Sequence, residues 1–498
     1  MPAASASTSR NLLWNYGGSA AAFLVQLGYT ALTARLVAPG QFGAYALALT
    51  LTTLLSYFAG NGMAVCLLRA DTLTRSLLRT ALRVAVGSGL VCCATVQLAA
   101  ALVGGLFGIA DTVPLLRLLV LQFPLTAVAV TLCAALRRLG RAQSAVLAET
   151  GGQLAGSTAG AALLLAGWSP YGLAMAWPVN GAVCLLIAHR MLSGGGPLPD
   201  GPAVGVRQLL GLSSFFGSTS FVSSAVSQLP VGCAALLGPA VVGYFSRAQN
   251  FVVLPLTVLN QGLARAVAPR LADSGRPDEH HPGRRLLPHR DVDDVVCAAS
   301  ALALGVFGVT AGLGPTALGL LLGPGWEPAV ALVPWLSTAA GLCLICYSGL
   351  ALDQIRHAPR AIVAAQAAMV TASLPVLAVA AARESVTWCA LAMAAGPAAG
   401  HAVQVACWRR DRVLRVRALL WAHTVHAGIG AGLFLVSWYA TRGERSVSAL
   451  GLGLLALGPC AGALWLGRRG VPAFRVAERR GYAGGGGRRS DQKAPQPR

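Results

Sequence analysis

The stretch from Val295 to Leu322, VVCAASALALGVFGVTAGLGPTALGLLL, decides the fold class because its 28 residues include no charged side chain. A helix of about 20 apolar residues spans the hydrocarbon core of a bilayer. Similar runs, separated by short polar breaks, recur from Asn11 to Leu466. We therefore expect an all-α integral membrane protein with about 14 transmembrane helices.

The composition supports this interpretation. Hydrophobic residues make up 55% of the chain and charged residues only 11%, whereas a soluble domain carries about 25% charged residues. This shortage of charge excludes an ordinary soluble enzyme. The formal net charge of +21 can indicate a nucleic-acid partner. The basic residues, however, lie in the breaks between apolar runs, which is typical of cytoplasmic membrane loops, so we expect no nucleic-acid partner.

The basic residues also predict the direction of the chain. If the N-terminus is cytoplasmic and the spans alternate, 31 of the 38 basic residues fall on the cytoplasmic side and five on the outer side. This bias predicts a multi-pass protein of the cell (plasma or inner) membrane with both termini in the cytoplasm. We expect an N-terminal six-helix lobe at 1–190, a cytoplasmic linker at 191–208, a C-terminal six-helix lobe at 209–407, two additional transmembrane helices at 408–467 and a disordered basic cytoplasmic tail at 468–498.

A short repeat suggests that the two lobes are duplicates. Pro39-x-x-x-Gly43 joins the first and second predicted spans, and Pro239-x-x-x-Gly243 joins the seventh and eighth. The two turns are six spans apart, an even number, so both halves have the same orientation. Transport folds are often built from such repeats, and we therefore expect two pseudo-symmetric lobes.

Polar residues inside the predicted spans supply the candidate binding site. Polar groups in a span usually face other helices or a water-filled cavity, and several here recur on one helix face. We expect a polar cavity between the two halves, and the substrate-binding candidates are Arg247, Asn250, Gln261 and Arg265 in the eighth span, with Arg35, Gln26 and Asn61. The arginines favour an anionic solute, especially a phosphate, which a guanidinium binds through two parallel hydrogen bonds. Arg247 and Arg265 lie near opposite ends of their span, so snorkelling to the interface is the alternative.

Glu149 is the only carboxylate that lies well inside a predicted span, which makes it a candidate for ion coupling. A structural pairing with an arginine is the alternative. Cys343-x-x-Cys346 lies within one apolar run without a second pair, so we interpret it as packing rather than as a metal site. We expect no catalytic residue, no metal and no cofactor.

Four stretches carry a resemblance to a known family: TARLVAPGQFGAY at 33–45, ALRRLGR at 135–141, GYFSRA at 243–248 and LGPGWEPA at 322–329. With these motifs in this order, the sequence resembles the polysaccharide transporter (oligosaccharide flippase) family of the multidrug/oligosaccharidyl-lipid/polysaccharide exporter superfamily. One departure concerns AGNGM at 59–63, where the family often has an acidic residue before a glycine pair.

The resemblance implies a transporter that flips a polyprenyl-diphosphate-linked oligosaccharide from the cytoplasmic to the outer leaflet for cell-surface polysaccharide assembly. It implies alternating access, with this lipid-linked oligosaccharide and membrane lipids as partners and a polysaccharide polymerase and glycosyltransferases as candidate partners. The main alternative is a cation-coupled drug or metabolite antiporter of the same superfamily. A membrane glycosyltransferase would need paired carboxylates at an outer loop, but the acids of the predicted outer loops are scattered.

Overall fold

The structure is a computed structural model of the 498-residue chain. The residues that it describes are 25–56, 62–69, 72–107, 111–194, 196, 198–202, 205–274, 276–277, 285–286, 288–356, 358–411, 413–441, 444–467 and 471–473.

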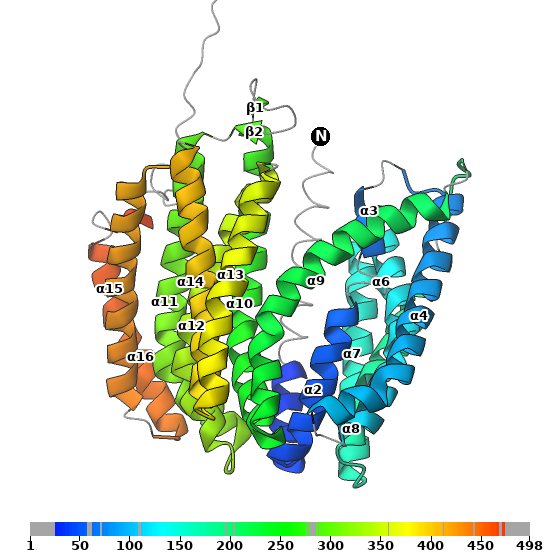
Figure 1. Ribbon diagram of the computed structural model, residues 1–498, viewed down its shortest axis with the longest axis horizontal. Helices are drawn as coiled ribbons and strands as arrows, with labels where there is room; N and C mark the ends of the chain where they lie inside the picture. The colour runs from blue at the N-terminus through cyan, green and yellow to red at the C-terminus, as the bar shows by residue number, and fades with distance from the viewer. Residues whose placement is uncertain are drawn as a thin grey trace, which may run out of the picture. The chain divides into compact units, whose positions relative to one another are not determined.

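Long helices account for most of these residues (Figure 1). In chain order the helices are α2 (Pro39–Ser56), α3 (Gly62–Arg69), α4 (Arg75–Phe107), α5 (Thr112–Leu119), α6 (Gln122–Arg138), α7 (Ala142–Leu165), α8 (Tyr171–Ser193), α9 (Val206–Leu236), α10 (Pro239–Ser274), α11 (His289–Leu322), α12 (Glu327–Ile355), α13 (Pro359–Ala382), α14 (Val386–Arg410), α15 (Val416–Thr441) and α16 (Val447–Leu466). Residues 25–36 are also helical and precede α2.

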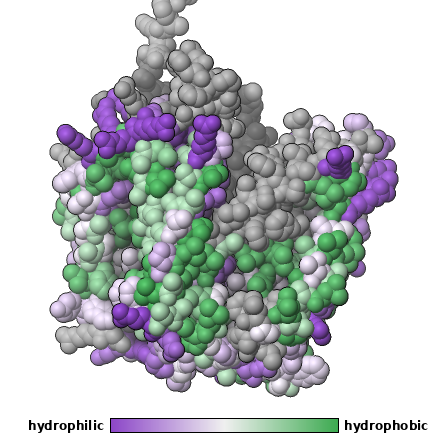
Figure 2. All heavy atoms as spheres, viewed as in Figure 1, coloured by the Kyte–Doolittle hydropathy of each residue, from purple (hydrophilic) through white to green (hydrophobic). Residues whose placement is uncertain are grey.

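Within the described residues, nine helical segments are long and apolar enough to span a membrane. The number is lower than the predicted 14, so that count is not confirmed. On the face drawn in Figure 2, apolar residues cover the middle of the helices and hydrophilic residues gather toward their ends. Such a distribution suits helices that cross hydrocarbon and end in water. The chain is a multi-pass, predominantly α-helical membrane protein.

The predicted break between the eighth and ninth spans contains a small departure from the all-α expectation. Strands β1 (Arg276–Pro277) and β2 (Arg285–Leu286) form an antiparallel pair, with Arg276 opposite Leu286 and Pro277 opposite Arg285. A pair of two-residue strands lacks the hydrophobic face that a stable sheet needs, so it does not change the fold class.

The described residues divide into two compact units, whose residue ranges differ from those of the predicted lobes. The first takes its residues from Met1–Phe251, Ala317–Val333 and Val370–Met393, and the second from Val252–Thr316, Pro334–Met369 and Ala394–Arg498. The division into six-helix lobes at 1–190 and 209–407 stays a prediction.

In the first unit, α7 and α8 pack closely because a row of glycines faces the neighbouring helix. A Cβ atom on Gly156 would collide with the main-chain oxygen of Ala176, and one on Gly160 would lie 2.8 Å from that of Gly172. Because lipid is as apolar as a leucine side chain, helices in a membrane associate through such close packing. The glycine spacing of four residues keeps the contact on one face of α7.

The two repeated turns also lie in the first unit, and they pack against each other. A Cβ atom on Gly43, near the start of α2, would collide with the carbonyl of Pro239, the first residue of α10. A Cβ atom on Gly243 would collide in the same way with the carbonyl of Pro39. Because neither glycine has a Cβ atom, the backbone of each turn can approach the glycine of the other turn. The contact is therefore reciprocal.

We predict that Gly43→Ala and Gly243→Ala each destabilise the protein by about 1–3 kcal/mol, because the added methyl group meets backbone that cannot move aside easily. Gly40→Ala is the matched control, since a Cβ there has nothing within 4 Å. Thermal unfolding in one detergent measures the difference. Equal melting temperatures for the Gly40 and Gly43 variants would contradict the packing described here.

Candidate functional site

Arg247, the leading candidate from the sequence, is buried in the first unit. Its side chain is 6% exposed, and its Nη2 donates a hydrogen bond of 2.7 Å to Thr33 Oγ1. The guanidinium carbon lies 3.7 Å from the centre of the Phe42 ring and 5.6 Å from that of Trp326. A cation over an aromatic face is attracted by the ring's quadrupole, and more strongly when both are desolvated.

The aromatic residues around Arg247 come from three distant segments. Trp326 is 1% exposed and donates a hydrogen bond of 2.9 Å from Nε1 to the carbonyl of Ala34. Its ring meets Phe42 and Tyr244 edge to face, at centroid distances of 6.0 and 5.9 Å. The cluster of Arg247, Phe42, Tyr244 and Trp326 thus joins α10 and α2 to the turn before α12.

In this conformation the guanidinium of Arg247 faces protein rather than an open site. Its Nε is buried and has no hydrogen-bond partner among the described residues. Holding a cation away from water is costly unless it is compensated. The Phe42 ring and the Thr33 hydroxyl supply part of that compensation, so the arginine anchors the turns. Its role in substrate binding stays a prediction.

Three of the other substrate-binding candidates have described side chains, and none of the three contacts the guanidinium of Arg247 in the cluster above. Asn250 and Arg35 are exposed, and Gln26 is exposed and accepts a hydrogen bond of 3.3 Å from Gln153 Nε2. Asn61 and the side chains of Gln261 and Arg265 lie outside the described residues.

Glu149 pairs with an arginine, as the alternative interpretation of the sequence suggested. Its Oε2 lies 2.6 Å from Arg137 Nη2, and the two side chains are 43% and 37% exposed. Arg137 lies in the last turn of α6 and Glu149 lies two turns into α7, so the pair connects consecutive helices. The ion-coupling role of Glu149 stays a prediction.

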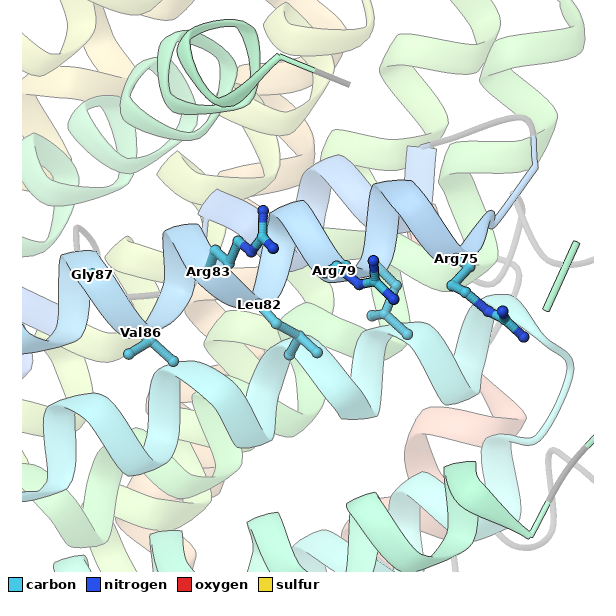
Figure 3. Close-up of a pocket in the computed structure, with 7 residues that line it drawn as sticks. Arg75, Arg79, Leu82, Arg83, Val86 and Gly87 are labelled. Carbon is cyan, nitrogen blue, oxygen red and sulfur yellow. The ribbon is translucent and has the colours of Figure 1, made fainter. Parts of the chain in front are cut away.

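The first unit also carries a ladder of arginines that the sequence analysis used only for orientation. Arg75, Arg79 and Arg83 recur every four residues, which places them on one face of α4 (Figure 3). They line an open groove of about 580 Å³ together with apolar side chains that include Leu82 and Val86. The ladder spans about 12 Å along the helix axis.

The ladder continues into an apolar surface on the same helix. Val86 and Leu90 follow the arginines on the same helix face and are 39% and 54% exposed. Arg75 lies 3.9 Å from Asp200 in an exposed pair, whereas Arg79 and Arg83 form no ion pair with a described residue. One side of α4 therefore offers cations at its N-terminal end and hydrocarbon beyond them.

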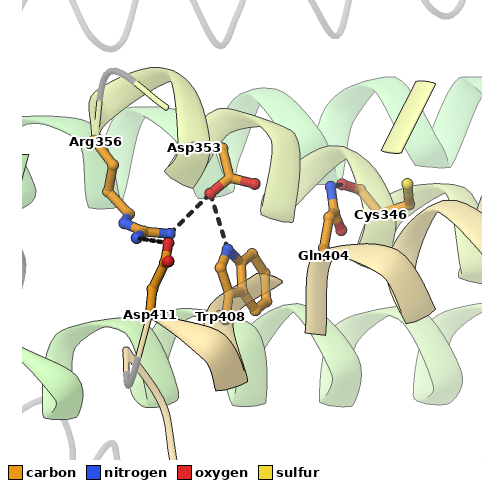
Figure 4. Close-up of polar contacts among 6 residues, drawn as sticks. All are labelled: Cys346, Asp353, Arg356, Gln404, Trp408 and Asp411. Atoms are coloured by element: carbon orange, nitrogen blue, oxygen red, sulfur yellow. Dashed lines mark hydrogen bonds and ion pairs between the residues drawn. The ribbon is translucent and has the colours of Figure 1, made fainter. Parts of the chain in front are cut away.

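The second unit holds a buried charge cluster that sequence patterns did not reveal (Figure 4). Arg356 is 1% exposed and lies 3.0 Å from an oxygen of Asp353 and 3.0 Å from one of Asp411. Trp408 Nε1 donates a hydrogen bond of 2.8 Å to Asp353 Oδ1. These bonds fasten the end of α12 to the end of α14.

Three histidines in the second unit extend the polar network. His401 Nε2 lies 3.3 Å from His423 Nε2, and its ring meets Trp408 edge to face at 6.1 Å. Ser300 Oγ lies 2.7 Å from His423 Nδ1 and 3.2 Å from His426 Nδ1. The sequence signal that was available is the presence of histidines within apolar runs, since ionisable residues there are usually functional or paired.

We predict that Asp353→Ala lowers stability by about 3–5 kcal/mol, because it leaves Arg356 buried with one partner fewer. Glu149→Ala is the matched control: it also removes an ion pair, but an exposed one that contributes about 0–1 kcal/mol. Thermal unfolding of both variants measures the difference. A melting temperature for Asp353→Ala as high as that of Glu149→Ala would contradict the buried pairing.

For Arg247→Ala we predict a loss of about 2 kcal/mol, since the change removes a charged hydrogen bond and a cation–π contact. Asn250→Ala, one turn along α10 at an exposed position, should unfold like the unchanged protein. An Arg247→Ala variant with unchanged stability and reduced transport would instead support direct contact with substrate.

The fold matches solved transporter structures. The lipid II flippase MurJ, in an inward closed conformation, shares 10% identity with this chain at a TM-score of 0.68, over 92% of this chain and 99% of that one. A MATE structure in the bent conformation shares 15% identity at 0.52, over 82% and 95%. A MOP superfamily transporter from Pyrococcus furiosus shares 14% identity at 0.53, over 83% and 95%. At such identities the likeness shows the fold alone.

No curated protein sequence matches the chain. The polysaccharide biosynthesis protein family matches residues 32–331, which include Arg247, its aromatic neighbours and the arginine ladder of α4. Since this match covers more than half of the 498 residues, the chain belongs to the polysaccharide biosynthesis protein family.

Proposed function

We propose that the protein flips a polyprenyl-diphosphate-linked oligosaccharide from the cytoplasmic to the outer leaflet of the cell membrane during polysaccharide assembly. The family match over residues 32–331 carries this proposal. The shared fold with a structure described as a lipid II flippase supports it. We propose transport rather than catalysis, with both termini cytoplasmic and with a polymerase and glycosyltransferases as candidate partners.

The substrate's chemistry explains why a protein is needed. Sugars and a diphosphate lose their water when they enter about 30 Å of hydrocarbon. A transporter must replace that water with polar groups while the lipid tail stays in the bilayer. The exposed Asn250, Arg35 and Gln26 are candidate contacts for the sugars. We keep Gln261, Arg265 and Asn61 as further candidates.

The arginine ladder of α4 is our candidate for the first contact with the diphosphate. Its three cations and the nearby Asp200 leave two positive charges, which matches the two negative charges of a diphosphate diester. Guanidinium groups bind phosphate oxygens in a bidentate manner. The polyprenyl tail fits the exposed apolar side chains of Val86 and Leu90, so one face of α4 suits both ends of the substrate.

Loss and reconstitution of the protein test the function. A deletion strain should accumulate the lipid-linked oligosaccharide, with its sugars still facing the cytoplasm. Purified protein in vesicles should make a fluorescent polyprenyl-diphosphate sugar accessible to an external quencher. Normal lipid levels in the deletion strain, together with export of cationic drugs by the purified protein, would favour the antiporter that the MATE likeness suggests.

We predict that Arg79→Gln with Arg83→Gln weakens binding of undecaprenyl diphosphate about tenfold or more, because each lost charged hydrogen bond contributes about 1.5–3 kcal/mol. Native mass spectrometry of the purified protein measures the bound lipid. Arg409→Gln with Arg410→Gln, which removes two exposed arginines from the end of α14, is the matched control. Equal binding by both double variants would exclude the ladder as the diphosphate contact.

A further inference from the structure

The three histidines of the second unit are linked in a chain whose hydrogen-bond directions can be assigned. Gln404 Nε2 donates to the carbonyl of Cys346 at 3.0 Å. Because that carbonyl can only accept, the amide oxygen of Gln404 faces His401 Nδ1, at 3.2 Å. His401 therefore carries its proton on Nδ1 when it is neutral.

The remaining tautomers follow from this first one. His401 Nε2 is an acceptor, so His423 Nε2 donates to it and His423 Nδ1 is left as an acceptor. Ser300 donates its hydroxyl proton to His423 Nδ1, and its oxygen accepts from His426 Nδ1. With these tautomers, three neutral imidazoles satisfy every hydrogen bond of the chain. From His426 to Ser300 to His423 to His401, each group donates to the next.

The chain ends on a basic nitrogen that is ready for a proton. His426 is 2% exposed, and its Nε2 is buried without a hydrogen-bond partner among the described residues. The assigned tautomer leaves a lone pair on that nitrogen. A buried unpaired acceptor is costly, and a bound proton would convert it into a donor.

We propose that His426, Ser300, His423 and His401 form a proton relay inside the membrane-spanning part of the second unit. A proton binds His426 Nε2, and the Nδ1 proton of His426 passes to Ser300. The Ser300 hydroxyl proton passes to His423 Nδ1, and the Nε2 proton of His423 passes to His401 Nε2. One proton enters, each hydrogen bond along the relay reverses, and the charge ends on His401 beside Trp408.

Among the described residues, α11, α12, α14 and α15 bring few other ionisable groups to this relay. Cys297 lies one turn before Ser300 on α11, and Cys346 meets Gln404 from α12. Trp408 contacts both His401 and Asp353, so the indole connects the histidine with the carboxylate. Asp353 is itself held by Arg356. On α14 and α15 the neighbours of His423 are His401 and His426.

Through this relay, a proton gradient can be coupled to transport. His426 Nε2 is enclosed in this conformation, so exchange of its proton with water requires the surrounding helices to open. Protonation is thereby tied to conformational change, and a site that is charged in only one conformation shifts the balance between the two. This coupling rests on the proposed function, whereas the relay itself does not.

Nitrogen-15 NMR of the histidine-labelled full chain in bilayers tests the relay. At alkaline pH we expect neutral rings with the proton on Nδ1 of His401 and His426 and on Nε2 of His423. On acidification we expect one positive charge for the three rings together. His189→Gln, which removes an exposed histidine at the end of α8, should change none of these signals. Other tautomers, or three rings that charge independently, would overturn the relay.

Ser300→Ala provides a second variant, because it interrupts the chain while filling nearly the same space. Imidazolium quenches indole fluorescence, so acid should quench Trp408 in the unchanged protein. This quenching should be lost in both Ser300→Ala and Trp408→Phe. Unaltered quenching in Ser300→Ala would overturn proton transfer through the serine.

The coupling is tested in vesicles that carry the fluorescent polyprenyl-diphosphate sugar. A pH gradient should change the flipping rate of the unchanged protein severalfold and leave that of His426→Gln unchanged. Equal responses to the gradient would overturn the coupling. Absence of flipping under all conditions would instead reject the proposed function, and the NMR result would still decide the relay.

Discussion

Inside a bilayer a buried polar or charged side chain cannot hydrogen-bond to water, and this constraint governs the three buried clusters described above. Arg247 lies over the Phe42 ring and donates to Thr33. Arg356 lies between two carboxylates. His401 of α14 bonds to His423 of α15, and Ser300 of α11 bonds to His423 and His426. Each of these pairings joins segments that are far apart in the sequence. The polar groups therefore stabilise the fold as well as supplying chemistry.

The arginine ladder of α4 departs from this rule, which is why it matters for function. Arg79 and Arg83 are exposed at the end of a membrane-spanning helix and form no ion pair with a described residue. Their exposed guanidinium groups can bind anions from outside the protein, and lipid phosphates are the anions available at that depth. The buried Arg247 and the exposed ladder thus have the same chemistry but different tasks.

The fold class could be predicted from the sequence because it depends on local properties. The length and apolarity of runs such as Val295–Leu322 decide whether a helix spans a membrane, and short motifs carry the family. The site was harder to predict. Glu149 appears isolated within its span, and only the packing of α6 on α7 brings Arg137 to it. Arg247 shares a helix face with Asn250, yet its surroundings are set by Phe42 and Trp326, which no periodic pattern connects with it. The histidine chain was missed for the same reason, since its members lie on three helices.

The reciprocal contact of Gly43 with Pro239 and of Gly243 with Pro39 has the form of an isologous interface, in which one patch meets its own copy across a twofold axis. Two separate half-length subunits could form such an interface, but only at concentrations that favour their association. Because both turns belong to one polypeptide, their encounter is intramolecular and independent of expression level.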